Sequence, residues 1–185
     1  MSANTLSAFV DNAERHHATV HRVEPDEVPG TVAELVDPPA VGVELPWDID
    51  LPASVATGAT AAELDAANTG VTAASFGIAD YGSLVLESDA AGGEAASLFP
   101  ERHVAVLRAV DVVPGMREAF GTLGDRLRDG ASAVLATGPS ATADMGELVI
   151  GAHGPRQVEI VLVEEGGGAD DRADAVAADG GDADE

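Results

Sequence analysis

The sequence contains no cysteine and no lysine, and each absence excludes a class of chemistry. Without cysteine the chain has no thiol nucleophile, no disulfide and no thiolate ligand for zinc or an iron–sulfur cluster. Without lysine it can form neither a Schiff base nor a lysine-dependent phosphate loop. We therefore expect no iron–sulfur cluster in this chain, and the sequence names no other cofactor.

Basic residues are scarce as well: 33 acidic residues face 9 basic ones, all of them arginine, which gives a formal net charge of −24. Aromatic residues make up only 3%. This composition is typical of halophilic proteins, because the Debye length falls to about 3 Å at 1 M salt and screens carboxylate repulsion. An ordinary acidic protein is the alternative, and circular dichroism on desalting distinguishes the two. Nucleic acid is excluded as a partner, since its phosphates would be repelled by such a surface.

Long apolar runs are also missing, and none approaches the roughly 18 residues of a membrane span. The beginning, MSANTLSAFVDNAERHH, lacks a positive region followed by an apolar stretch, so we expect no secretory signal and a cytoplasmic location. The length of 185 residues suits one domain. Past Glu165 the composition becomes glycine-rich and acidic with little to bury, which predicts one domain over 1–165 and a disordered acidic tail over 166–185.

Apolar periodicity predicts alternating helices and strands along the domain. The expected helices are 4–15, 28–36, 61–67, 114–127 and 142–150, and the expected strands are 19–23, 40–44, 54–57, 103–108, 131–136 and 158–163. Thr60 and Glu63 have the spacing of a capping box. The segment 70–88 predicts two further strands joined by a tight turn, and 88–96 an acidic loop. This pattern indicates an α/β fold, a three-layer sandwich with a largely parallel sheet and an antiparallel portion.

The segment Gly138–Pro155 carries the strongest signal for a site, because it gathers hydroxyls, a carboxylate and an imidazole between glycines. A helix that begins near Thr142 would offer free amide groups and a positive dipole end to an anion, with Ser140 and Thr142 as further donors. The alternative is an ordinary helix cap with Asp144 complementing the dipole. GPSAT is similar to a nucleophile elbow, but threonine stands where that motif needs glycine, which disfavours Ser140 as a covalent nucleophile.

Four other residues are weaker candidates. His153 lies in a loop where an imidazole can act as acid or base, or can simply be hydrogen-bonded in a structural turn. His103 is the first residue of a predicted strand. Its side chain either points to the same edge of the sheet as His153 or has no role beyond beginning the strand. Asp80 is also a common turn residue, and Thr72 a common strand residue. The cluster from Arg15 to Arg22, with three histidines, has no carboxylate on a shared face, so we expect solvated surface and no metal.

Three segments occur in the order and spacing of a known family: GVTAASFGIADYGSLVLES, LFPERHVAVL and GPSATADMGELVIGAHGPRQVEIVLV. Together they cover 70–163 and resemble the LUD domain family. The resemblance implies a fold like that of ribose-phosphate isomerase, glucosamine-phosphate deaminase and the CoA-transferases, with sites at strand ends. It further implies a role in oxidising L-lactate to pyruvate with iron–sulfur partner proteins, in which this cysteine-free chain binds a small anionic ligand.

The resemblance also implies a set of site residues. The matching positions are Thr72, Asp80, Gly82, His103, Gly138, Ser140, Thr142, Asp144, His153 and Gly154. Asp80, Asp144 and His153 are the catalytic candidates, and the others are candidates for ligand binding. Tyr81-Gly82-Ser83 replaces the frequent Thr-Gly-Thr, and Met145-Gly146 replaces Ile-Glu.

Two other functions remain open. In the first, the chain is a stand-alone isomerase, hydrolase or transferase for a phosphorylated or acyl substrate, with Asp80 or Asp144 as base or nucleophile and His153 as acid. In the second, it is a structural adaptor with an empty pocket.

Overall fold

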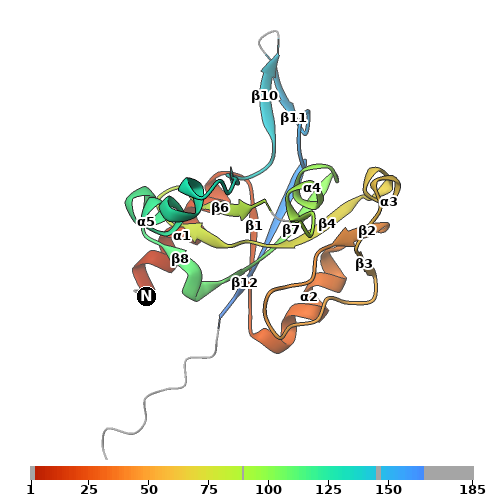
Figure 1. The fold of residues 1–185 in the computed structure, drawn as a ribbon, viewed down its shortest axis with the longest axis horizontal. Coiled ribbons are helices and arrows are strands. Elements are labelled where there is room, and N and C mark those ends of the chain that lie inside the picture. Colours follow the sequence, from red (N-terminus) through yellow and green to blue (C-terminus); the bar gives the residue numbers. More distant parts are fainter. Residues whose placement is uncertain (1–2, 89, 145–146, 165–185) are drawn as a thin grey trace, which may run out of the picture.

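Six parallel strands form the main sheet of the computed structural model, which describes residues 3–88, 90–144 and 147–164 (Figure 1). The strand order is β1-β12-β7-β4-β2-β3. The bounds are β1 Thr19–Val23, β2 Ala40–Gly42, β3 Val55–Thr57, β4 Thr69–Ala73, β7 Arg102–Arg108 and β12 Gln157–Val163. The expected α/β class with a largely parallel sheet is confirmed. The predicted tail, 166–185, lies outside the described residues.

The described chain has five α-helices: α1 Ala3–Arg15, α2 Val28–Leu35, α3 Ala61–Ala66, α4 Gly93–Leu98 and α5 Met116–Arg128. All but α4 begin and end close to predicted residues. Two short 3-10 turns, η1 Pro25–Glu27 and η2 Ala109–Asp111, complete the helical elements of the described residues. The capping box is confirmed, because the Thr60 hydroxyl accepts from the Glu63 amide and the Glu63 carboxylate accepts from the Thr60 amide. Helix α4 stands where we predicted the end of a loop: Ala96 and Ser97 pack inside, which small residues permit.

A second sheet holds β8 Val112–Val113, β5 Phe76–Ile78, β6 Ser83–Glu87 and β9 Ala133–Ala136, in that order. The segment predicted to hold two strands therefore holds three, and the first of them, β4, belongs to the main sheet. Two consecutive amides mark the transfer of the chain. Ala74 N–H donates to Val106 of the main sheet, and Ser75 N–H donates to Val85 of the second.

The predicted helix over 142–150 is wrong, because the chain forms two antiparallel strands there, β10 Ala141–Asp144 and β11 Glu147–Ile150. We call these two strands the arm. The consecutive Leu148, Val149 and Ile150 favour a strand through their β-branched members, and Gly146 disfavours a helix by about 1 kcal/mol. In Figure 1 the arm stands away from both sheets.

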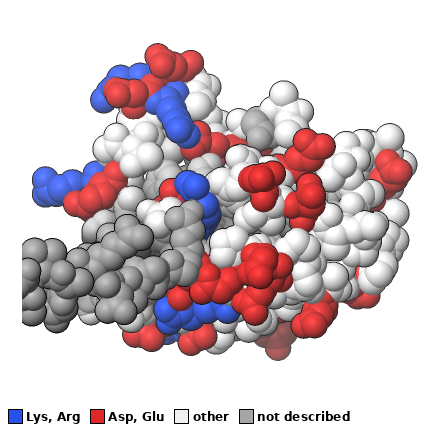
Figure 2. Space-filling view, turned by 90° about the horizontal axis from the view of Figure 1, so that it is seen from below, with Lys and Arg blue, Asp and Glu red and all other residues white. Residues whose placement is uncertain are grey.

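Carboxylates dominate the surface of the described chain, and Figure 2 shows them spread over one face with arginines beside several of them. Ion pairs of this kind join Arg22 to Glu164 and Arg156 to Glu101. Among residues 3–88, 90–144 and 147–164, no helix combines the length and apolarity needed to cross a membrane.

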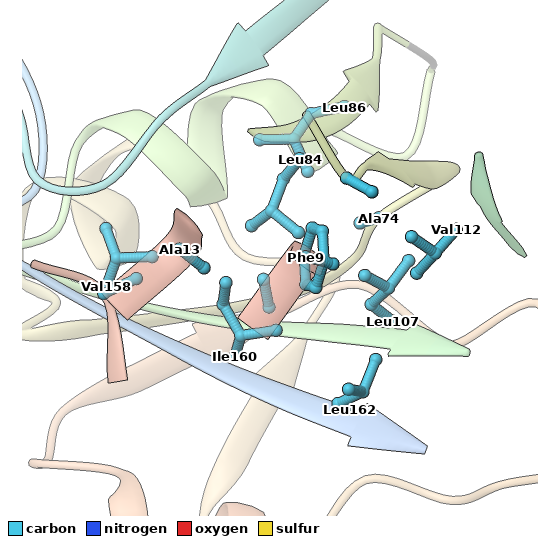
Figure 3. Close-up of a cluster of buried hydrophobic side chains, with 13 residues drawn as sticks. Phe9, Ala13, Ala74, Leu84, Leu86, Leu107, Val112, Val158, Ile160 and Leu162 are labelled. Carbon is cyan, nitrogen blue, oxygen red and sulfur yellow. The ribbon is translucent and has the colours of Figure 1, made fainter. Parts of the chain in front are cut away.

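The two faces of the main sheet bury different side chains, because side chains alternate along each strand. On one face Leu107 and Ile160 pack against Phe9 of α1 and Leu84 of the second sheet (Figure 3). On the other face, valines of the strands pack against Val28 and Val32 of α2. Both faces are covered, which explains why these strands are almost continuously apolar.

Candidate functional site

A pocket of about 700 Å³ lies at the carboxyl ends of β2, β4 and β7, and we call it the edge pocket. Val43 follows β2, Ala73 ends β4 and Arg108 ends β7, and all three line it. The opposite wall comes from the second sheet and from Thr122 and Arg126 of α5. In open α/β sheets, ligands bind at the carboxyl edge of the strands, so this pocket is the leading candidate site.

Arg108 is fixed in place at the edge pocket. Its Nε and Nη2 donate to the two carboxylate oxygens of Asp111 at 2.7 and 3.1 Å. The guanidinium carbon also lies 5.2 Å from the ring centroid of Trp47, a cation–π distance. Asp111 thus occupies the Nε–Nη2 edge of the guanidinium and fixes the orientation of Arg108 in the pocket.

The edge pocket is polar, with three carboxylates and two guanidinium groups in its lining. Its second arginine, Arg126, forms an ion pair with Glu87. Glu44, Glu87 and Asp111 line the pocket together with the two arginines, so the charges nearly balance. An anion would have to compete with these carboxylates for the guanidinium groups.

Thr72 and His103 form a buried pair beneath this edge. Thr72 Oγ1 and His103 Nε2 lie 2.8 Å apart, and each residue is only 1% exposed. Burial lowers the pKa of His103 to about 4, so its imidazole is neutral at ordinary pH. Thr72 also lines the edge pocket. The structure thus brings together two of the residues predicted from the sequence, although His103 lies inside the molecule.

Asp80 and Gly82 occupy the turn between β5 and β6. Asp80 is exposed, and its amide donates to Pro114 at 3.0 Å. Gly82 has φ +63°, and a Cβ there would overlap the backbone nitrogen of Ala13 in α1. Packing against α1 is therefore a sufficient reason for this glycine.

Gly138 and Ser140 hold the base of the arm. Gly138 has φ +63° and its Cα faces the carbonyl of His16 too closely for a side chain. Ser140 N–H donates to Pro155 and the Ser140 carbonyl accepts from Gly151, both at 2.8 Å. Because no helix begins here, the predicted anion site made of helix amides is wrong.

The remaining predicted residues also belong to the arm or its base. Thr142 is exposed in β10, and Asp144 ends that strand. His153 is exposed and lines a second pocket of about 400 Å³ with Gly154, Phe99 and neighbouring residues. Asp144 lies four residues along β10 from Ser140 at the base, or about 13 Å at 3.3 Å per residue.

The predicted residues are thus divided between places: Thr72 lines the edge pocket, and His153 and Gly154 line the second pocket. Their functional roles stay predictions. Sequence reasoning missed Trp47, Arg108 and Arg126 as pocket residues. The sequence did hold one signal for Arg108: it is the charged residue at the end of the apolar strand HVAVLR, where ligands of parallel sheets bind.

One surface prediction also changes. His21 of the histidine cluster contacts the Glu159 carboxylate of the neighbouring strand at 2.9 Å, so it does have an acidic partner. Among the described residues, no three histidine or acidic side chains gather as they would around a metal ion.

The fold and the edge pocket define an α/β domain of the kind that binds ligands at the carboxyl edge of a parallel sheet. A family model, the LUD domain, matches residues 46–163. The chain belongs to the LUD domain family.

Solved and curated relatives agree with this assignment. Lactate utilization protein C of Deinococcus radiodurans is 32% identical over 177 residues, covering 87% of this chain and 80% of the relative. Lactate utilization protein C of Bacillus velezensis is 33% identical over 104 residues, covering 54% of this chain but only 43% of that protein. The crystal structure of a DUF162 family protein from Deinococcus radiodurans matches with a TM-score of 0.66 and 26% identity, covering 88% of this chain and 99% of the other.

Proposed function

We propose that this protein takes part in lactate utilization, as a cluster-free subunit that binds a small anionic ligand in the edge pocket. Its similarity to proteins named lactate utilization protein C supports the pathway. The observation that carries the site is Arg108, which Asp111 and Trp47 hold at the carboxyl end of a central strand. Of the residues that the resemblance implies, only Thr72 lines this pocket, and the roles of the others remain predictions.

The chemistry of the pocket suits a carboxylate such as lactate or pyruvate. A carboxylate can accept charge-assisted N–H bonds from a guanidinium beside the partners it already has, since the Nε–Nη2 edge of Arg108 pairs with Asp111. Hydroxyls of Ser75 and Thr122 also line the pocket and can donate or accept. We assign Arg108 the binding of the carboxylate and these hydroxyls the recognition of the remaining oxygen.

Oxidation of lactate to pyruvate removes two electrons and two protons, which need an acceptor. The chain has no cysteine to ligate an iron–sulfur cluster. We therefore propose that the electrons pass to partner proteins that carry such clusters. Affinity purification of the full chain in molar KCl should recover a protein with an iron–sulfur absorption spectrum.

Growth tests the pathway. Deleting the gene should abolish growth on L-lactate as sole carbon source and leave growth on pyruvate intact. Rescue should succeed with the natural gene and with Arg117→Gln, an exposed arginine of α5 outside the edge pocket, and fail with Arg108→Gln. Unchanged growth of the deletion strain on lactate would refute the proposal.

Binding tests the site. Calorimetric titration of the isolated protein with L-lactate and with pyruvate in molar KCl should give a Kd that Arg108→Gln weakens at least tenfold. Arg117→Gln should leave it unchanged.

Turnover of a sugar phosphate or acyl thioester by the isolated protein, lost in Asp144→Asn, would instead favour the stand-alone enzyme. Absence of binding, with substitutions tolerated throughout 138–154, would favour an adaptor.

A further inference from the structure

The two faces of the arm differ in character. The antiparallel register pairs Ala141 with Ile150 and Ala143 with Leu148, so these four side chains share one face. Thr142, Val149 and Glu147 lie on the other. The first face therefore carries no polar or charged side chain, and we call it the apolar face.

The apolar face is open to solvent. Leu148 is 69% exposed and Ile150 40%, and both alanines are exposed. An isolated two-stranded hairpin is marginally stable in water and needs a third strand or another packed surface. No described element of the chain covers these two strands, whose one strong set of contacts is with each other. Among the described residues, the arm therefore lacks the packed surface that such a hairpin needs.

We propose that this surface is the arm of a second copy of the chain, with the two apolar faces packed together. Within each face, β10 contributes a row of alanines and β11 a row of Leu148 and Ile150. A two-fold axis along the arm places the small row of one copy over the large row of the other. Sheets pack face to face in this interdigitating manner, so the face complements itself.

The distribution of charge on the arm is compatible with a second copy as the occupant. A second copy also carries a net charge of −24, and the two must approach without opposing their carboxylates. On the arm, Glu147 lies on the face that points away from the contact. The apolar face is thus a part of this acidic surface where two copies can meet with no charged side chain between them.

The size of the face sets the strength of the contact. Stable dimers bury about 1,200 Å² or more in total, and four small-to-medium side chains per copy supply less. We expect a weak dimer with a Kd of roughly 0.01–1 mM.

The absence of cysteine makes the geometry directly testable. Ala143→Cys and Thr142→Cys place single thiols at neighbouring exposed positions on opposite faces of the arm. In molar KCl, a short bismaleimide should cross-link Ala143→Cys at least fivefold more than Thr142→Cys, increasingly so with protein concentration. Equal cross-linking of the two variants would overturn the proposal.

Sedimentation velocity on the natural chain, from about 10 µM to 1 mM, gives an independent measurement. Leu148→Thr should weaken association at least fivefold, while Val149→Thr on the other face should change it less than twofold. Both side chains are exposed, so circular dichroism should show both variants folded. A chain that stays monomeric throughout this range would overturn the proposal. Finding a different protein bound to the arm would overturn it as well.

Discussion

Strands β4 and β7 and the arm hold four of the ten residues that the family resemblance implies, yet these strands and the arm lie in opposite environments. The apolar run of β7 is buried from His103 to Leu107, between strands on either side and packed layers above and below. The equally apolar run of β11, from Leu148 to Ile150, is exposed. Similar strings of residues therefore reach different burial, because burial depends on which elements the topology brings alongside.

This difference has a consequence for function. Residues such as Thr72 and His103 are buried in a sheet with neighbours on both sides, and Thr72 also reaches the edge pocket. Residues of the arm, such as Leu148, are held by one neighbouring strand and are open to solvent. Motif residues that lie together in sequence therefore need not serve one cavity.

Removing salt tests the whole described fold and should have the largest effect. At 0.1 M salt the Debye length is about 10 Å, and the charge of −24 is no longer screened. We expect unfolding on dialysis from 2 M to 0.1 M KCl, followed by circular dichroism and by fluorescence of Trp47, the single tryptophan. An intact fold in dilute buffer would contradict the halophilic interpretation.

The same substitution in the two regions separates their energetics. Leu107→Ala leaves a cavity in the fully buried core and should lower the free energy of unfolding by about 2–5 kcal/mol. Leu148→Ala on the arm should change it by less than about 0.5 kcal/mol. Urea titration in molar KCl at low protein concentration measures both. Similar losses for the two variants would show that the arm is part of the core.

Acid should weaken the sheet through His103. Its pKa is about 4 in the folded state and about 6.5 when unfolded, so between these values the unfolded chain binds the extra proton. Stability is complete above pH 6.5 and falls as pH decreases toward 4, by on the order of 3 kcal/mol from this group. The difference in pH slope between the natural chain and His103→Gln measures it. If His103→Gln has the same pH slope as the natural chain, His103 is not buried as a neutral imidazole.

Two glycines in the same conformation test close packing against α1. Gly82 and Gly58 both have φ near +65°, which costs a side chain about 1–2 kcal/mol. Gly58 has open space around its Cα, whereas a Cβ at Gly82 would overlap Ala13. Gly82→Ala should therefore destabilise the protein by at least about 2 kcal/mol more than Gly58→Ala. Equal losses in thermal unfolding would mean that α1 moves freely.

The sequence was sufficient to predict most of the sheet. The central strands β7 and β12 each consist of an apolar run with nearby turn residues, and such a run is a specific signal for a strand that is buried on both faces. The same reasoning failed at 142–150, where the spacing of apolar residues fits either a helix or a strand. Neither face of this segment is buried, so burial gives no pattern that would distinguish the two. It also missed Trp47 and Arg108 as neighbours, because 60 residues of intervening chain separate them and only the fold brings them together.

The cap of α3 is a purely local feature and should show the smallest effect. Thr60→Ala removes the hydroxyl that accepts from the Glu63 amide, which should cost about 1 kcal/mol. Thr57→Ala, an exposed threonine of β3, is the matched control and should be nearly neutral. The Thr60 backbone amide and hydroxyl both hydrogen-bond the Glu63 carboxyl and lower its pKa, so that pKa should rise in Thr60→Ala and stay unchanged in Thr57→Ala. Titration by NMR measures this shift, and a constant pKa in both variants would show that the capping box does not form in solution.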